Sequence, residues 1–66
     1  MDASRTIGAR IREARRAAGL TQEQLAELAD TSTRTVRDIE KGTGATALGI
    51  VARVAEVVGL RLVADG

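Results

Sequence analysis

The first apolar positions of the chain recur with helical spacing. Ile7, Ile11, Ala14 and Ala18 follow one another at intervals of four, three and four residues, which places them on one face of an α-helix. Gly19 comes directly after them, and glycine commonly follows the last turn of a helix. The pattern therefore predicts an amphipathic helix that ends before Gly19 and buries its aliphatic face.

Two further helices are predicted, and a short turn joins them. Thr21 precedes Gln24 by three residues, which is the spacing of a capping box at the start of a helix. The predicted inner face of this helix consists of Leu25, Ala26, Leu28 and Ala29. Residues 30–31 form the turn, and Ser32 is a suitable N-cap for the third helix. This helix is expected to run to about residue 41, because Gly42 can end it.

A fourth helix is predicted between Thr46, as its N-cap, and Gly59. Its polar side holds only Gly49, Arg53 and Glu56, so the apolar arc spans about 220°, against roughly 100° for an ordinary surface helix. The excess apolar surface predicts contact with a second copy of the chain.

The end of the chain alternates between apolar and polar residues. Residues 60–64 read Leu-Arg-Leu-Val-Ala, which predicts a short β-strand. A lone strand leaves its backbone groups unpaired, and the same strand of a second subunit could pair with it.

The composition narrows the possible functions. A chain of 66 residues indicates one domain, and such a domain buries only roughly 60% of the surface that its unfolded form exposes. Disulfides and zinc sites are excluded because Cys and His are absent, so oligomerisation is the expected support. The absence of Tyr as well removes the usual acid–base and nucleophile sets, so neither an enzyme nor a cofactor is expected.

The hydropathy of the chain indicates its compartment. The sequence holds no apolar run of roughly 20 residues that could span a membrane, and residues 1–10 contain no signal-peptide core. We therefore expect a cytoplasmic protein with no membrane partner. Because no enzyme is expected, no small-molecule substrate is expected either.

The third helix carries the candidate chemistry. The net charge of the chain is only +1, but the basic residues are clustered. On a helical wheel Val36 and Ile39 fall on one side. The opposite arc holds Thr33, Arg34, Arg37, Asp38 and Lys41. Arginine can bond guanine bidentately and lysine neutralises phosphate, although a simple solvated face would look the same on this helix alone.

The context of that helix favours DNA. Two capped helices with a short turn between them have the geometry of a helix-turn-helix, in which the second helix enters the major groove. The first helix of the pair begins near Thr21 and Gln22. Its free N–H groups and positive dipole end could hold a phosphate, with Gln22 as an additional donor.

The stretch 20–42, LTQEQLAELADTSTRTVRDIEKG, resembles the phage-repressor helix-turn-helix family, also called XRE or Cro-like. The matching residues are Leu20, Thr21, Gln22, Leu25, Ala26, Ser32, Val36, Ile39, Glu40 and Gly42. The resemblance extends over about residues 4–59, and Thr31 departs from it because the family often has an apolar residue there.

This resemblance implies specific contacts. The residues implied to read base edges are Thr33, Arg34, Arg37 and Asp38. The residues implied to hold the DNA backbone are Gln22 and Lys41, and we expect Thr21, Ser32 and Thr43 to contact phosphates as well. The family also implies a buried ion pair between Arg15 and Glu40.

The second half of the chain is similar to a narrower group. Residues 42–64 resemble the C-terminal half of HipB-like antitoxins, in which the fourth helix is followed by a strand that pairs across a homodimer. Such proteins repress their own operon and bind a toxin that is encoded beside them. The surplus apolar arc of the fourth helix and the predicted strand place the interface at Ile50, Val54, Val57, Leu60 and Leu62, and the resemblance fits this expectation.

Together these observations predict one all-α helix-turn-helix domain over residues 1–66. It has four helices and a short C-terminal β-strand, with the helix-turn-helix at 21–41 and the dimerisation helix and strand at 46–64. The homodimer is expected to repress transcription by occupying a palindromic operator in double-stranded DNA, with half-sites roughly 34 Å apart. An antitoxin with a partner toxin and a stand-alone repressor both remain open. A protein-interaction module is a third alternative, because a near-zero net charge weakens nonspecific DNA binding.

Overall fold

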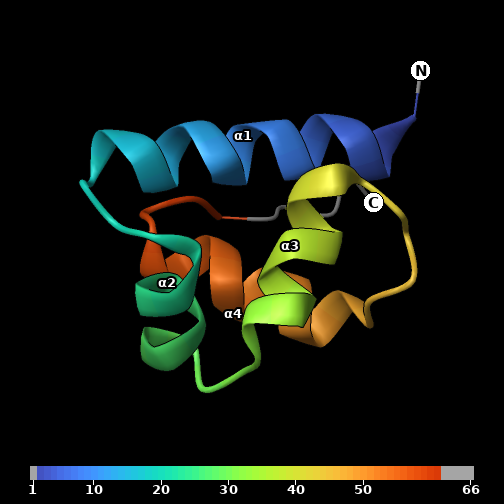
Figure 1. Ribbon diagram of the computed structural model, residues 1–66. Coiled ribbons are helices and arrows are strands. Elements are labelled where there is room, and N and C mark those ends of the chain that lie inside the picture. The colour runs from blue at the N-terminus through green and yellow to red at the C-terminus, as the bar shows by residue number, and fades with distance from the viewer. Residues whose placement is uncertain (1, 62–66) are drawn as a thin grey trace.

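The computed structural model describes residues 2–61, which form four α-helices. They are α1 (Ala3–Ala17), α2 (Gln22–Leu28), α3 (Thr33–Lys41) and α4 (Leu48–Val57). The long helix α1 lies along one side of the molecule, and the three shorter helices are grouped against its other side (Figure 1). This arrangement confirms the all-α, four-helix prediction.

The core is small and entirely aliphatic. Ile11, Leu25, Val36 and Val54 are its largest fully buried side chains, and each of the four helices contributes one of them. The remaining buried hydrophobic residues are Ala26, Ala29, Ile39 and Ala55. A core that takes one branched side chain from each helix fixes the positions of all four helices together, because a closely packed interior does not tolerate gaps.

Two side-chain caps of the central helices form as predicted. The Thr21 hydroxyl accepts a hydrogen bond of 3.0 Å from the backbone N–H of Gln24, and the Gln24 side chain accepts one of 2.8 Å from the N–H of Thr21. At the start of α3, Ser32 Oγ accepts a bond of 3.1 Å from the N–H of Thr35. Gly42 ends α3 with a left-handed φ of 74°, as the sequence predicts.

Helix α1 has a side-chain N-cap, whereas α4 has none. The first regular apolar position of α1 is Ile7, but Asp2 acts as its N-cap and accepts a hydrogen bond of 3.0 Å from the N–H of Ser4. The predicted N-cap of α4, Thr46, lies one residue too early. Ala47 occupies the cap position and makes no side-chain cap bond.

Helix α1 and the end of α3 approach each other closely at Gly8. A Cβ atom built on Gly8 would overlap the carbonyl oxygen of Ile39. Gly42 is also crowded, since a Cβ there would lie 2.6 Å from Cα of Arg5. The absence of side chains at these two glycines lets the C-terminal end of α3 pack directly on the backbone of α1.

Two apolar predictions are wrong in detail. Leu28 was expected on the inner face of α2, yet it is 61% exposed. The buried side of α2 is formed by Leu25, Ala26 and Ala29, and Leu28 lies about 100° away from the centre of that side on a helical wheel. The structure also corrects Val54, which was expected at the dimer interface and is 0% exposed within a single chain.

The predicted strand falls mainly outside the described residues. Leu60 and Arg61 belong to neither a helix nor a strand, and residues 2–61 contain no strand at all. Residues 62–64, including Leu62 of the expected interface, lie beyond the part of the chain that the structure describes.

Residues 2–61 contain no helix that is long and apolar enough to cross a membrane.

Candidate nucleic-acid interface

The turn between α2 and α3 has a defined backbone conformation. Asp30 has a φ of 54°, and the N–H of Thr31 donates a hydrogen bond of 2.9 Å to the carbonyl of Ala26. The N–H of Asp30 donates in the same way to the carbonyl of Glu27 at 3.2 Å. This pair of bonds is a Schellman motif, which ends α2 sharply and sets the direction in which α3 begins.

A side chain from α4 holds the same turn. Arg53 Nε donates a hydrogen bond of 2.7 Å to the carbonyl of Ala29, and another guanidinium nitrogen donates one of 3.2 Å to the carbonyl of Asp30. The sequence pattern placed Arg53 only on the polar side of its helix. The available signal was that Arg53 is the only cation of α4, because the long stem of an arginine can reach across a helix to unpaired carbonyl groups.

Helix α3 presents its basic edge to solvent, as the sequence predicts. Arg34, Arg37 and Lys41 are exposed, whereas Val36 and Ile39 on the opposite side are buried. Within residues 2–61, none of these three cations takes part in an ion pair or a side-chain hydrogen bond. Three charges on one helix edge are therefore free to bind an anionic partner.

The two other predicted base-reading residues are less accessible. Thr33 and Asp38 are both half-buried, so only part of each side chain can reach a ligand. Thr33 lies in the first turn of α3, directly after the Ser32 cap. Because Ser32 satisfies the N–H of Thr35, the N–H groups of Thr33 and Arg34 remain as free donors in the described structure.

The ion pair implied by the family resemblance is present. Arg15 Nε donates to Glu40 Oε2 at 2.7 Å, and a second guanidinium nitrogen of Arg15 donates to Oε1 at 3.1 Å. The side chains are only 11% and 3% exposed. Arg15 also donates a bond of 2.8 Å to the carbonyl of Leu20, so this arginine connects α1, α3 and the loop before α2.

Gln22 lies between the ion pair and the surface. Its Nε2 atom donates a hydrogen bond of 3.2 Å to Glu40 Oε1, which the sequence did not indicate. Since an amide nitrogen has two donor hydrogens, Gln22 keeps one for an outside acceptor. The carboxylate of Glu40 is thus held by two neighbours and carries little uncompensated charge.

The remaining predicted phosphate ligands lie on the surface near these elements. Thr21 and Ser32 are exposed at the starts of α2 and α3, where both hydroxyls serve as caps. Thr43 is exposed in the loop after α3, and its hydroxyl makes long hydrogen bonds of 3.4 Å to the carbonyl of Asp38 and 3.3 Å from the N–H of Ala45. These three hydroxyls bind backbone groups at the start of α2 and at both ends of α3.

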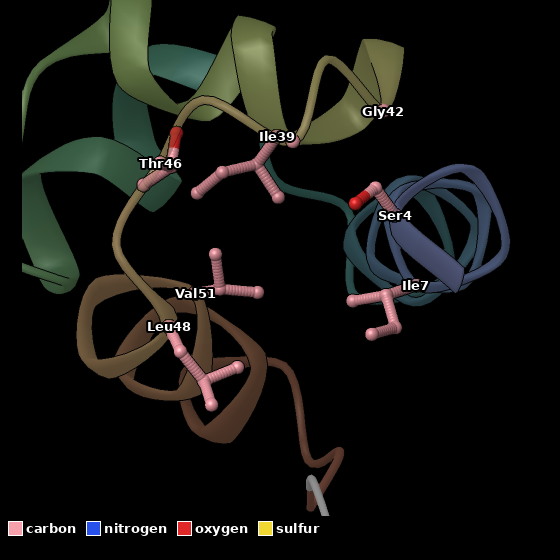
Figure 2. Close-up of a pocket in the computed structure, with 8 residues that line it drawn as sticks. Ser4, Ile7, Ile39, Gly42, Thr46, Leu48 and Val51 are labelled. Carbon is pink, nitrogen blue, oxygen red and sulfur yellow. The ribbon is translucent and has the colours of Figure 1, made fainter. Parts of the chain in front are cut away.

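A cavity of about 100 Å³ is lined by none of the exposed cations of α3. It opens between α1, α4 and the loop that follows α3, as Figure 2 shows. Its residues are Ser4, Ile7, Ile39, Gly42, Gly44, Thr46, Leu48 and Val51. No titratable side chain lines this cavity, so it offers no acid–base chemistry and takes no part in the basic surface.

The expected dimer residues occupy unequal positions on α4. Ile50, Val57 and Leu60 are half-buried and pack against the core, whereas Val54 is fully buried. Leu48 lies on the other side of the buried residues Val54 and Ala55 and is 70% exposed. The surplus apolar surface of α4 is thus divided into two flanks, one with Ile50 and Val57 and one with Leu48.

Comparisons with known proteins agree with this geometry. The helix-turn-helix family matches residues 11–64. Among solved structures, the chain is similar to the clp gene regulator ClgR from Corynebacterium glutamicum, with 26% identity and a TM-score of 0.76. The similarity covers 88% of this chain but only 62% of the ClgR chain, so the present chain spans less than two thirds of that regulator. A comparison with curated protein sequences finds no match.

Proposed function

From the premise that the chain belongs to the helix-turn-helix family, we propose that it is a transcriptional repressor that binds a palindromic operator as a homodimer. Membership of this family and the likeness to a gene regulator both support a DNA-binding transcriptional regulator. Our proposal adds three points to this support: repression, formation of a homodimer, and a partner toxin.

One observation carries the proposal. Arg34 and Arg37 stand exposed on α3, while Val36 and Ile39 fix the opposite side of that helix in the core. A helix held in this way can insert its exposed edge into a major groove without moving. Of the family's expected base-reading residues, these two arginines carry the strongest potential contacts, because each can bond guanine bidentately.

The residues around α3 are proposed to fix the position of the DNA. Lys41 neutralises a phosphate at the C-terminal end of α3, and the free N–H groups of Thr33 and Arg34 are available near its start. Phosphate contacts of this kind set the register of a protein on the duplex, whereas base contacts provide specificity. Thr21, Gln22, Ser32 and Thr43 are the proposed further phosphate ligands.

The experiment is a footprint of the purified protein on DNA that lies upstream of its own reading frame. We expect protection of two half-sites whose centres are about one helical turn, roughly 34 Å, apart. Binding should weaken steeply with salt, since each phosphate contact releases counterions. A protein that shows no salt-dependent binding to any duplex would be the interaction module that the sequence left open.

We further propose that the repressor is a HipB-like antitoxin. The support comes from the resemblance of residues 42–64 to that group and from the apolar flanks of α4, which exceed what its own core covers. A toxin bound there would leave Arg34 and Arg37 free for DNA, and it could strengthen repression by bridging adjacent dimers.

Co-expression with the adjacent reading frame tests the antitoxin proposal separately. We expect the neighbouring protein to be toxic alone, harmless in the presence of this chain, and co-purified with it. A harmless neighbour that does not co-purify would leave a stand-alone repressor, and the footprint would be unaffected by that outcome.

A further inference from the structure

A basic depression lies where α1, α2 and α3 meet. It is lined by Arg12, Gln22, Arg37, Glu40 and Lys41 and encloses about 300 Å³. Arg37 and Lys41 belong to the edge of α3 already described, whereas Arg12 comes from α1. The C-terminal end of α3 points toward α1 (Figure 1), so the basic surface continues from one helix to the other.

The carboxylate in this depression does not cancel its positive charge. Glu40 is 3% exposed and is bound by Arg15 through two hydrogen bonds and by Gln22 through a third. Its charge is therefore balanced by an arginine that does not line the depression. Arg12, Arg37 and Lys41 remain as three exposed cations around a floor that is close to neutral.

Arg12 lies on the same face of α1 as Arg15. It precedes Arg15 by three residues, and residues with this spacing lie on the same face of a helix. Because Arg15 is fixed against Glu40, Arg12 is directed toward the same junction. On its other side Arg12 shares a second depression with Arg16 and Glu13, but it makes no ion pair with any residue in the range 2–61.

We propose that this depression binds a phosphodiester group of the DNA backbone and that Arg12 is a phosphate ligand supplied by α1. The proposal rests on the proposed function and extends its contact surface beyond the helix-turn-helix. An arginine fork with two neighbouring cations suits a phosphate, which offers several acceptor oxygens and one negative charge. Since such a contact carries no sequence information, Arg12 would anchor the protein on any duplex.

The test is a salt titration of binding to a mixed-sequence DNA duplex for the full chain and two variants. Arg12→Gln should lower affinity on the order of 3- to 10-fold and reduce the slope of log affinity against log salt by about 0.9. Arg12→Lys should restore most of the slope, because lysine retains the charge. Arg10→Gln is the matched control, since Arg10 is also exposed on α1 but lines a different depression with Glu13, Ala14, Ala17 and Leu60.

Each outcome separates this proposal from the function on which it rests. If wild type binds with a steep salt slope and Arg12→Gln does not change it, the Arg12 site is wrong and the repressor proposal stands. Equal losses in Arg12→Gln and Arg10→Gln would show a general effect of net charge and would also overturn the site. If wild type binds no duplex at all, the proposed function itself fails. Unchanged melting temperatures would establish that the variants are folded. We expect this result because Arg10 and Arg12 are exposed and make no side-chain hydrogen bond within residues 2–61.

Discussion

The Nε atom of Arg53 lies 2.7 Å from the carbonyl oxygen of Ala29, to which it donates a hydrogen bond. Ala29 is the C-cap of α2, and Arg53 belongs to α4. A second bond from the same guanidinium reaches the carbonyl of Asp30. The Arg53 side chain therefore connects α4, which we propose contacts a partner, to the turn between α2 and α3.

We expect Arg53→Gln to lower the free energy of unfolding by about 1–2 kcal/mol, because the two carbonyl groups lose a charged donor. Urea denaturation followed by circular dichroism measures this change. Glu56→Gln is the control, since Glu56 is exposed on the same helix and makes no side-chain hydrogen bond within residues 2–61. The control should stay within about 0.5 kcal/mol of wild type, and identical midpoints for the two variants would contradict a role of Arg53 at the turn.

The Arg15–Glu40 pair is expected to be essential for folding. Glu40→Gln removes the negative charge from a side chain that is 3% exposed and leaves the Arg15 guanidinium without a counter-charge. Breaking a buried pair from one side typically costs about 3–5 kcal/mol, which is comparable to the whole stability of a small domain. A thermal melt of Glu40→Gln that matches wild type would mean that water solvates both groups.

Base reading by α3 can be tested at Arg34. We expect Arg34→Ala to weaken operator binding by about 1–3 kcal/mol and to relax the preference at one base position. Lys41→Ala should instead weaken operator and unrelated DNA by similar factors, because a phosphate contact is blind to sequence. Intact operator affinity in Arg34→Ala would show that α3 lies in the groove in another register.

The helix-turn-helix was predictable because its signals are local. Thr21 with Gln24, and Ser32 with Thr35, are caps formed between residues three positions apart, so neighbouring residues determine them. The same applies to Gly42, whose conformation ends α3. The exposed cations of α3 followed from one helical wheel, since Val36 and Ile39 identify its buried side.

What could not be predicted depends on how the helices pack on one another. The apolar arc of α4 is much wider than its contact with the core, so the sequence could not show that Val54 faces inward and Leu48 outward. The capping bonds from Arg53 join residues more than 20 positions apart. Gly8 gave no signal either, because a glycine on a helix face reveals nothing about the backbone that approaches it.

Gly8 is expected to tolerate no side chain. Gly8→Ala would place a Cβ atom against the Ile39 carbonyl oxygen, and that contact is between two backbones. We expect the free energy of unfolding to fall by about 1–3 kcal/mol from this overpacking, despite the better helix propensity of alanine.

Gly49→Ala is the control, because Gly49 also lies in a helix but has nothing within 4 Å of its Cβ position. Gly49→Ala should be neutral or stabilising by up to about 1 kcal/mol. Equal melting temperatures for the two variants would contradict the close packing of α1 on α3.

The last prediction concerns the flank of α4 that meets the second copy in the proposed homodimer. Val54→Glu cannot answer this question, because it would bury a charge in the core of a single chain and unfold it. Ile50 and Val57 are separated by seven residues and are both half-buried, so they form one continuous stripe along α4. Leu60 follows them toward the end of the chain that the resemblance places at the dimer axis.

We therefore expect Val57→Glu to give a folded monomer, because two-fold symmetry would bring the two introduced carboxylates together. Leu48→Glu is the matched control on the other flank, where the wild-type side chain is 70% exposed, and it should remain a dimer. Light scattering at several concentrations measures the mass of each variant, and a thermal melt shows whether each is folded. A dimeric Val57→Glu together with a monomeric Leu48→Glu would assign the interface to the Leu48 flank, beside the apolar cavity in Figure 2.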